Sequence, residues 1–75
     1  MTKERLLEKI IKLAEKKGWK KDYEQAKGIG VSASFWSMIK SGQRGIDSVN
    51  FLRKVVKALP ELREDIVEYV VGKEK

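Results

Sequence analysis

The chain has 75 residues, enough for one small domain. It contains neither cysteine nor histidine, which excludes disulfides and thiolate metal sites and removes the commonest general base. No apolar run is long enough to cross a bilayer, and the basic N-terminus lacks the apolar core of a signal peptide. We therefore expect a single cytoplasmic domain over residues 1–75, with no metal and no cofactor.

The positive charge is unevenly distributed along the chain. Lysine and arginine outnumber aspartate and glutamate by 17 to 11, and the net charge is +6. Residues 1–46 contain 11 basic and five acidic residues, whereas residues 47–75 contain six of each. A mixed Lys/Glu surface is common on small helical proteins, but an excess confined to one part of the chain favours a polyanionic partner.

Apolar periodicity and capping residues predict three helices in the first part of the chain. The first begins at a cap on Thr2 and runs to about residue 17. Gly18 is placed to end this helix, and Trp19 is placed to close the core behind it. The second and third helices cover about residues 20–27 and 33–40.

Two further helices follow a loop around residues 43–46. Asp47 or Ser48 caps the fourth helix, and Pro60 ends it. The fifth runs from about residue 61 to 71, with Gly72 after its end and a short tail over residues 73–75. Apolar residues recur at helical spacing, at Val49, Leu52, Val56 and Leu59 in the fourth helix and at Leu62, Ile66, Tyr69 and Val70 in the fifth. The predicted fold is a compact, all-α, five-helix domain.

The stretch from Asp22 to Ser41 is predicted to be a helix-turn-helix. Ala26 lets the first helix of the pair pack closely against the second, and Gly28 and Gly30 are both able to take positive φ in the turn. Ser32 is placed to cap the helix that follows.

The third helix has two different faces. Trp36 and Ile39 are predicted to face inward, and Val31 and Trp36 have the spacing of a hydrophobic staple. Ser34, Ser37 and Met38 face outward and are small or unbranched. The backbone of this helix is therefore able to lie close to another surface, as in a helix that enters the DNA major groove.

The segment AKGIGVSASFWSMIKSGQR, followed by a helix ending in KALP, resembles the DNA-binding domain of the Cro and lambda-type phage repressor family. The matching residues are Ala26, Gly30, Val31, Ser32, Trp36, Ile39, Ser41, Gly42 and Arg44. The resemblance implies a lambda repressor-like fold that covers nearly the whole chain. It also implies a sequence-specific, nucleoid-associated regulator of transcription, a repressor, that inserts its third helix in the major groove of double-stranded DNA.

By position, the resemblance implies a set of base-facing residues, namely Ser32, Ala33, Ser34, Ser37 and Met38. It places Ser41, Gln43 and Arg44 along the phosphates, and Lys20, Lys21 and Lys40 join them by their charge. The chain departs from the family at three positions: Ala33 and Asp22 replace glutamines that often contact DNA, and Gln25 replaces an apolar residue.

Other interpretations stay open. Ile66, Tyr69 and Val70 either pair with a second copy of the chain or close the core of the monomer. A protein-interaction module, such as an antitoxin or adaptor, predicts weak affinity for duplex DNA and an exposed apolar patch on the fourth or fifth helix. RNA binding is disfavoured because the aromatic rings mostly fit core positions. We do not expect an enzyme, since the only clustered carboxylates are surface charges at the start of the fifth helix: Glu61, Glu64, Asp65 and Glu68.

Overall fold

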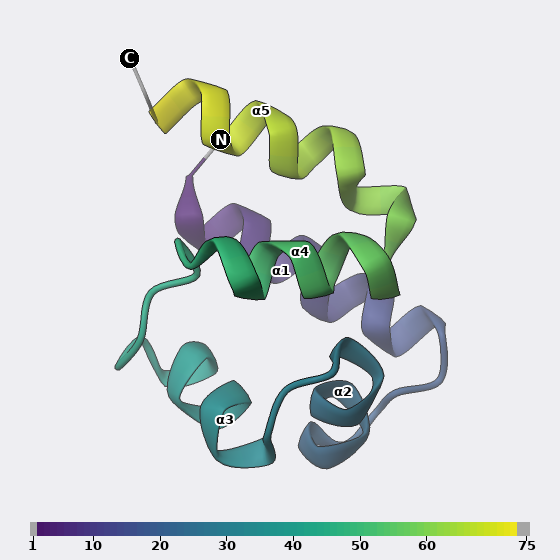
Figure 1. Ribbon diagram of the computed structural model, residues 1–75. Helices are drawn as coiled ribbons and strands as arrows, with labels where there is room; N and C mark the ends of the chain where they lie inside the picture. Colours follow the sequence, from purple (N-terminus) through teal and green to yellow (C-terminus); the bar gives the residue numbers. More distant parts are fainter. Residues whose placement is uncertain (1, 74–75) are drawn as a thin grey trace.

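The computed structural model describes residues 2–73, and in that range the chain forms five α-helices and one short 3₁₀ turn. They are α1 (Lys3–Lys16), α2 (Asp22–Ile29), α3 (Ala33–Ser41), α4 (Val49–Ala58), the 3₁₀ turn η1 (Pro60–Leu62) and α5 (Arg63–Lys73). α2 and α3 lie at one end of the molecule and α5 at the other, with α1 and α4 between them (Figure 1). The predicted all-α, five-helix fold is confirmed.

Short-range hydrogen bonds set the starts of three helices, as predicted. Thr2, Ser32 and Ser48 each accept a hydrogen bond from the backbone N–H three residues later, at 3.2, 3.1 and 3.4 Å. Each bond satisfies one of the N–H groups that have no partner in the first turn of a helix. Asp47, the alternative cap of α4, instead accepts a hydrogen bond from the Tyr69 hydroxyl, which ties the loop before α4 to α5.

The predicted bounds of two helices are wrong at both ends. α2 ends at Ile29 rather than at residue 27, and α5 begins at Arg63, after the 3₁₀ turn, rather than at residue 61. α2 begins at Asp22 rather than at residue 20, because Lys21 has an extended backbone and its N–H bonds to the Glu24 carboxylate at 3.0 Å. α5 continues through Gly72 to Lys73, because this glycine does not adopt the positive φ that ends a helix. The rest of the predicted tail, residues 74–75, lies outside the described residues.

All five helices contribute to one core around the fully buried Trp36. The core residues are Leu6, Ile10, Ala26, Ile29, Trp36, Ile39, Ile46, Phe51, Leu52, Val55, Leu59, Leu62, Ile66 and Tyr69. The predicted apolar stripe of α4 is wrong at its first position, since Val49 is 65% exposed. Phe51 and Val55, which broaden the predicted stripe, are buried, and the Phe51 ring packs 6.3 Å from that of Trp36 between ring centroids.

Ion pairs join the outer faces of α1 and the C-terminal segment. Lys9 contacts Asp65 at 2.8 Å, and Lys17 contacts Glu61 at 3.1 Å. A hydrogen bond to its own backbone, followed by the bond to Lys17, holds the pKa of Glu61 below its usual value. Two of the four clustered carboxylates, Asp65 and Glu61, therefore form ion pairs with a lysine of α1 and with the lysine that directly follows it.

Candidate nucleic-acid interface

The corner between α2 and α3 is built from a left-handed glycine and a serine cap. Gly30 follows α2 with φ of 96°, and the next N–H, that of Val31, bonds to the Ala26 carbonyl at 2.9 Å. This bond closes the end of α2 and reverses the chain, so that Ser32 starts α3 directly afterwards. Ala26 is 1% exposed, which agrees with a close approach of α2 to its neighbours.

Gly28 has a different role from the predicted one. Its φ is not positive, and it lies inside α2 rather than in the turn. A Cβ atom added at Gly28 would lie 2.8 Å from three atoms of the Trp19 indole, closer than side chains approach each other. The glycine is therefore required because the Trp19 ring packs directly on the backbone of α2.

Gln25 is the only buried polar residue of the described core, at 2% exposure. Its amide oxygen accepts a hydrogen bond from the Trp36 indole N–H at 2.9 Å, and its amide N–H group donates to the Trp19 carbonyl at 2.9 Å. One side chain thus satisfies a donor on α3 and an acceptor in the loop before α2. These two hydrogen bonds explain how a polar side chain is accommodated in the core.

Four of the five candidate base-facing residues, Ala33, Ser34, Ser37 and Met38, lie on α3, and Ser32 directly precedes it. Ser32, Ala33, Ser34 and Ser37 are exposed, whereas Met38 is half-buried. The Ser32 hydroxyl already accepts the capping bond from Phe35. The structure therefore leaves Ser34 and Ser37 as the exposed hydroxyls within α3 beside its N-terminus.

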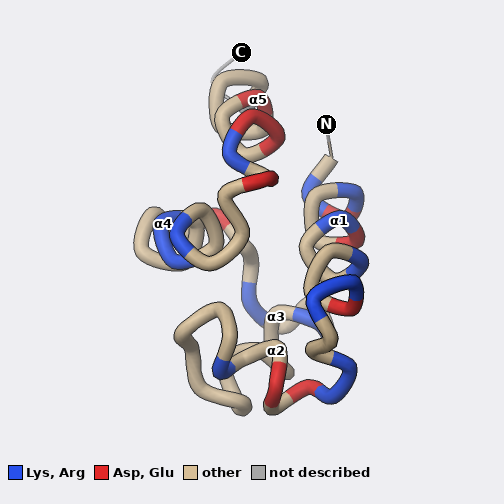
Figure 2. Tube along the Cα trace, turned by 90° about the vertical axis from the view of Figure 1, so that its right-hand side faces the viewer, with Lys and Arg blue, Asp and Glu red and all other residues tan. Residues whose placement is uncertain are grey.

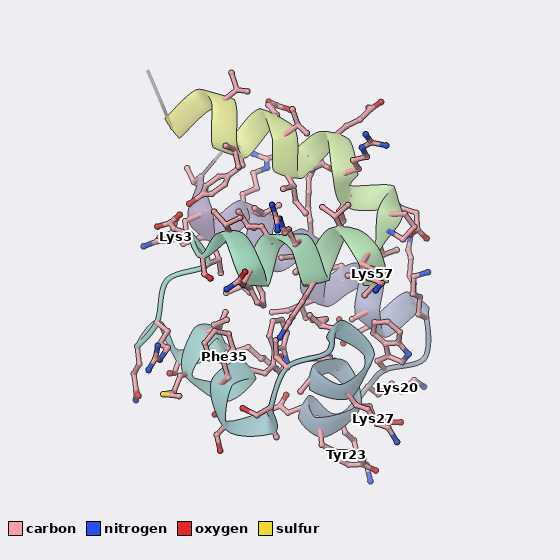
Figure 3. The ribbon with its side chains drawn as sticks, in the orientation of Figure 1. Lys3, Lys20, Tyr23, Lys27, Phe35 and Lys57 are labelled. Carbon is pink, nitrogen blue, oxygen red and sulfur yellow. The ribbon has the colours of Figure 1, made fainter. Side chains whose placement is uncertain are left out.

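An open hollow of about 800 Å³ lies between this face of α3 and the start of α2. It is lined by candidate residues of both kinds, Lys20, Lys21, Ala33, Ser34 and Ser37, together with Asp22 and Tyr23. Lys20, Tyr23 and Lys27 project from the α2 end of the molecule (Figure 3). The aromatic rings mostly lie in or against the core, as predicted, and Tyr23 is the exception: it is 59% exposed, with the Lys21 ammonium 5.9 Å from its ring centroid.

Several candidate phosphate-binding side chains already have partners within the chain. The Lys40 ammonium forms an ion pair with Asp22 at 2.6 Å, and the Ser41 hydroxyl donates to the Met38 carbonyl at 3.1 Å. The Arg44 guanidinium lies 5.7 Å from the centroid of the Phe35 ring. Lys20 and Gln43 are exposed. All six candidates are thus at the surface, but Lys40 and Asp22 neutralise each other.

The N-terminal end of α1 adds a cation that the sequence analysis did not select. Lys3, Lys40, Ser41 and Arg44 line one hollow of about 190 Å³, between the start of α1 and the end of α3, and Glu4 lines it as well. Lysine and arginine also recur along α1 and the loop into α2 (Figure 2). No local pattern could indicate the role of Lys3, because it is 41 positions from Arg44 and only the fold brings the two to one hollow.

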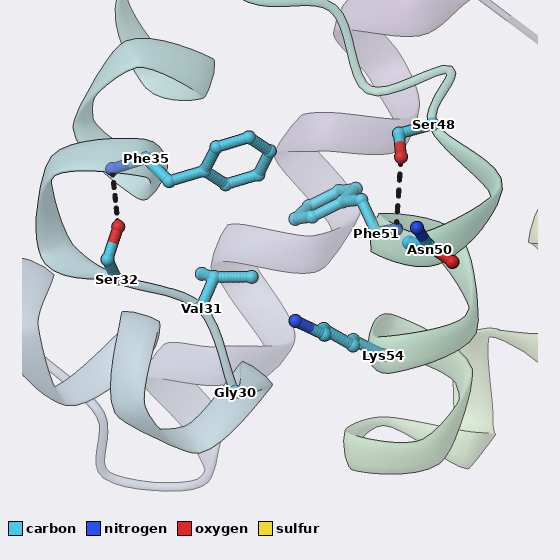
Figure 4. A pocket seen from close by; sticks show the side chains of 8 residues that line it. All are labelled: Gly30, Val31, Ser32, Phe35, Ser48, Asn50, Phe51 and Lys54. Atoms are coloured by element: carbon cyan, nitrogen blue, oxygen red, sulfur yellow. Dashed lines mark hydrogen bonds between the residues drawn. The ribbon is translucent and has the colours of Figure 1, made fainter.

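A third hollow, of about 350 Å³, lies between the α2–α3 corner and the start of α4 (Figure 4). Both capping serines, Ser32 and Ser48, line it, and so do Asn50 and Lys54. Two helix N-termini, each with partial positive charge, and one lysine therefore border the same hollow. Neither Asn50 nor Lys54 was selected from the sequence, where both lie on the polar side of a predicted amphipathic helix.

Within residues 2–73, no helix combines the length and the apolar character that crossing a bilayer demands. No protein-family model, curated protein or solved structure matches this chain. The likeness to the Cro and lambda-type repressor family therefore stays a prediction from the residues that carry it.

Proposed function

We propose that this chain binds double-stranded DNA through α3 and acts as a regulator of transcription, a repressor. The observation that carries the proposal is the outer face of α3, where exposed small side chains share a hollow with Lys20 and Lys21. A helix with small outward side chains is able to approach base edges closely, and flanking cations neutralise the phosphates on either side of a groove.

In this proposal the hollow near the start of α3 and the hollow near its end have the same role. Lys20 and Lys21 would neutralise phosphates at the start of α2, and Lys3 and Arg44 would do so at the end of α3. These contacts fix the position of α3 on the duplex but carry no sequence information. Ser34 and Ser37 would then contact base edges, and Ala33 would pack against a thymine methyl group.

Direct readout by these residues is modest, because a serine hydroxyl both donates and accepts and so discriminates poorly between bases. Asp22 would repel a phosphate if it were unpaired, and its ion pair with Lys40 removes that repulsion. The same ion pair removes one cation from the interface. We therefore expect that binding depends on fewer phosphates than the number of basic residues on this end of the molecule suggests.

The test is binding to duplex DNA of random sequence over a salt series, measured by fluorescence anisotropy. The slope of log K against log salt concentration is expected to be about −0.9 for each phosphate contacted, and several contacts should be seen. Arg44→Ala should weaken binding and make the slope shallower by about one contact. Arg63→Ala, at the start of α5 on the far end of the molecule, is the matched control and should change neither quantity. No binding at low salt would refute the proposal.

A second candidate function is a protein-interaction module on the same fold. One observation favours it: an apolar groove between α4 and α5, which is the kind of exposed patch that this alternative predicts. The two functions are separable, because the groove is formed by helices other than α2 and α3. A chain that fails to bind DNA but binds a protein through this groove would have the second function.

A further inference from the structure

Tyr23 carries an aromatic ring that the fold does not use. Its exposed fraction is 59%, and no other aromatic side chain among the described residues is exposed. The ring belongs neither to the core cluster nor to the half-buried side chains that pack against this cluster. Tyr23 therefore adds little to the stability of the monomer, and both its ring and its hydroxyl are open to a ligand.

Three lysines accompany this ring at the start of α2. An aromatic side chain in a helix points back toward the N-terminus, and Tyr23 is the second residue of α2, so its ring lies beside the preceding loop. The Lys21 ammonium is 5.9 Å from the ring centroid. Lys27 follows Tyr23 by four residues and lies on the same side of the helix. Lys20, Tyr23 and Lys27 project from one end of the molecule (Figure 3).

The surface around the ring has a positive excess. The three lysines belong to no ion pair within residues 2–73. The acidic residues that flank Tyr23 in the sequence both have partners: Asp22 pairs with Lys40 at 2.6 Å, and the Glu24 carboxylate accepts a hydrogen bond from the Lys21 backbone N–H at 3.0 Å. Four lysines against two carboxylates favour an anionic ligand at this place.

An exposed ring beside cations is the combination by which proteins bind single-stranded nucleic acid. The bases of a single strand expose their faces and stack on aromatic side chains, while lysines neutralise the phosphates. Base pairs inside a duplex are stacked on each other, so their faces are not available to Tyr23. The open hollow of about 800 Å³ beside the ring reaches the outer face of α3, where the hydroxyls of Ser34 and Ser37 are able to hydrogen-bond to phosphates or base edges.

We propose that this surface binds single-stranded nucleic acid, with an unpaired base stacked on the Tyr23 ring and the adjacent phosphates at Lys20, Lys21 and Lys27. The sequence pattern disfavours RNA binding because the aromatic rings mostly fit core positions, and Tyr23 is the ring that does not. Single-strand binding is a further activity, separate from insertion of α3 into a major groove. The two proposals share Lys20 and Lys21, but each is measured with its own nucleic acid, so either can fail while the other holds.

The first experiment compares two fluorescein-labelled single strands, each about 12 nucleotides long, by fluorescence anisotropy at the same salt concentration. One is oligodeoxyuridylate, and the other has the same backbone with abasic sites in place of the bases. The unaltered chain should bind the strand with bases more tightly, by roughly 5- to 150-fold, which is the range for one base stacked on an aromatic ring. This comparison uses no variant, so it does not depend on how a variant folds.

The second experiment repeats the comparison with substituted chains. Tyr23→Ala should weaken binding of the strand with bases by the same factor and leave binding of the abasic strand unchanged, because the abasic strand has nothing to stack on the ring. Tyr23→Phe keeps the ring and should bind like the unaltered chain. Lys27→Gln should weaken binding of both strands and make the slope of log K against log salt shallower by about 0.7. Arg63→Ala, on the far end of the molecule, is the control and should change neither strand's binding (Figure 1).

An oligouridylate of the same length differs from oligodeoxyuridylate only in its 2′-hydroxyl groups and identifies the source of the strand. Tighter binding of the oligouridylate supports the proposal with RNA as the ligand, and tighter binding of the oligodeoxyuridylate supports it with DNA. Three results would overturn the proposal. The first is no binding of single strands at low salt, and the second is equal affinity for strands with and without bases. The third is a Tyr23→Phe chain that binds as weakly as Tyr23→Ala, or a Tyr23→Ala chain that binds like the parent.

Discussion

Replacing Gln25 with leucine should destabilise the fold, because it removes the acceptor of the Trp36 indole N–H. This indole belongs to a residue with 0% exposure, so water cannot replace the lost partner without entering the core. A buried donor left without an acceptor costs about 1–3 kcal/mol. The Trp19 carbonyl also loses a donor, but it belongs to a half-buried residue and is easier to hydrate.

Leucine also buries more apolar surface than glutamine, which offsets part of this loss. We expect a net destabilisation of about 1–2 kcal/mol, which corresponds to a fall in Tm of roughly 4–16 °C for a domain of this size. Urea unfolding followed by circular dichroism measures the free energy directly. Circular dichroism is preferable to fluorescence here, because the substitution changes the surroundings of both tryptophans.

A double-mutant cycle separates the hydrogen bond from packing. Trp36→Phe removes the indole donor and by itself leaves a cavity. In the Trp36→Phe background, Gln25→Leu no longer orphans a buried N–H, so it should cost about 1 kcal/mol less than in the unaltered chain. Equal costs in the two backgrounds, or a Gln25→Leu variant as stable as the parent, would refute the assignment of Gln25 as the link between α2 and α3.

Three other substitutions have defined outcomes. Gly28→Ala should destabilise the protein by about 1 kcal/mol, because contact with the Trp19 ring outweighs the better helix propensity of alanine; urea unfolding measures this. Asp22→Asn should strengthen binding to random duplex DNA and steepen its salt slope by about one phosphate, because Lys40 loses its partner. Burial, followed by the hydrogen bond to Asp47, raises the pKa of Tyr69 to about 12, so the unfolded chain loses this proton first as pH rises. Unfolding free energy should therefore fall between about pH 10 and 12, and Tyr69→Phe should remove that part of the fall.

Controls and contradicting results follow from the same contacts. Gly72→Ala lies in a helix where an added Cβ meets nothing within 4 Å, so it should be neutral or slightly stabilising. A Gly28→Ala variant that behaves like Gly72→Ala would contradict the packing of Trp19 on α2. Unchanged DNA affinity after Asp22→Asn would mean that Lys40 is not near a phosphate. A Tyr69→Phe protein with the same alkaline stability profile as the parent would show that Tyr69 does not cause the fall.

Local chemistry explains why most of the helices were predictable. Each of the caps Thr2, Ser32 and Ser48 depends on a hydrogen bond from the backbone N–H three residues later. Gly30 and Gly42 end α2 and α3 by taking the left-handed backbone conformation directly after each helix. These interactions are complete within a few residues, so they are readable from the sequence. The inward positions of Trp36 and Ile39 follow equally from helical spacing.

The predictions that failed concern residues whose conformation or burial depends on how the helices pack against each other. Gly72 does not end α5, although glycine ends α2 and α3, because residue type permits a positive φ without imposing it. Val49 has helical spacing with the core residues of α4, yet the packing of Phe51 on Trp36 rotates it into solvent.

The sequence by itself determined the all-α class, the starts of the capped helices, the α2–α3 corner and the positive excess in the first part of the chain. Only the tertiary structure decided that Gln25 joins two tryptophans, that Lys40 is paired with Asp22, and that Lys3 shares a hollow with Arg44. The physical reason is range: capping and periodicity act within one or two helical turns, whereas these contacts join side chains whose separation in space depends on how all five helices pack.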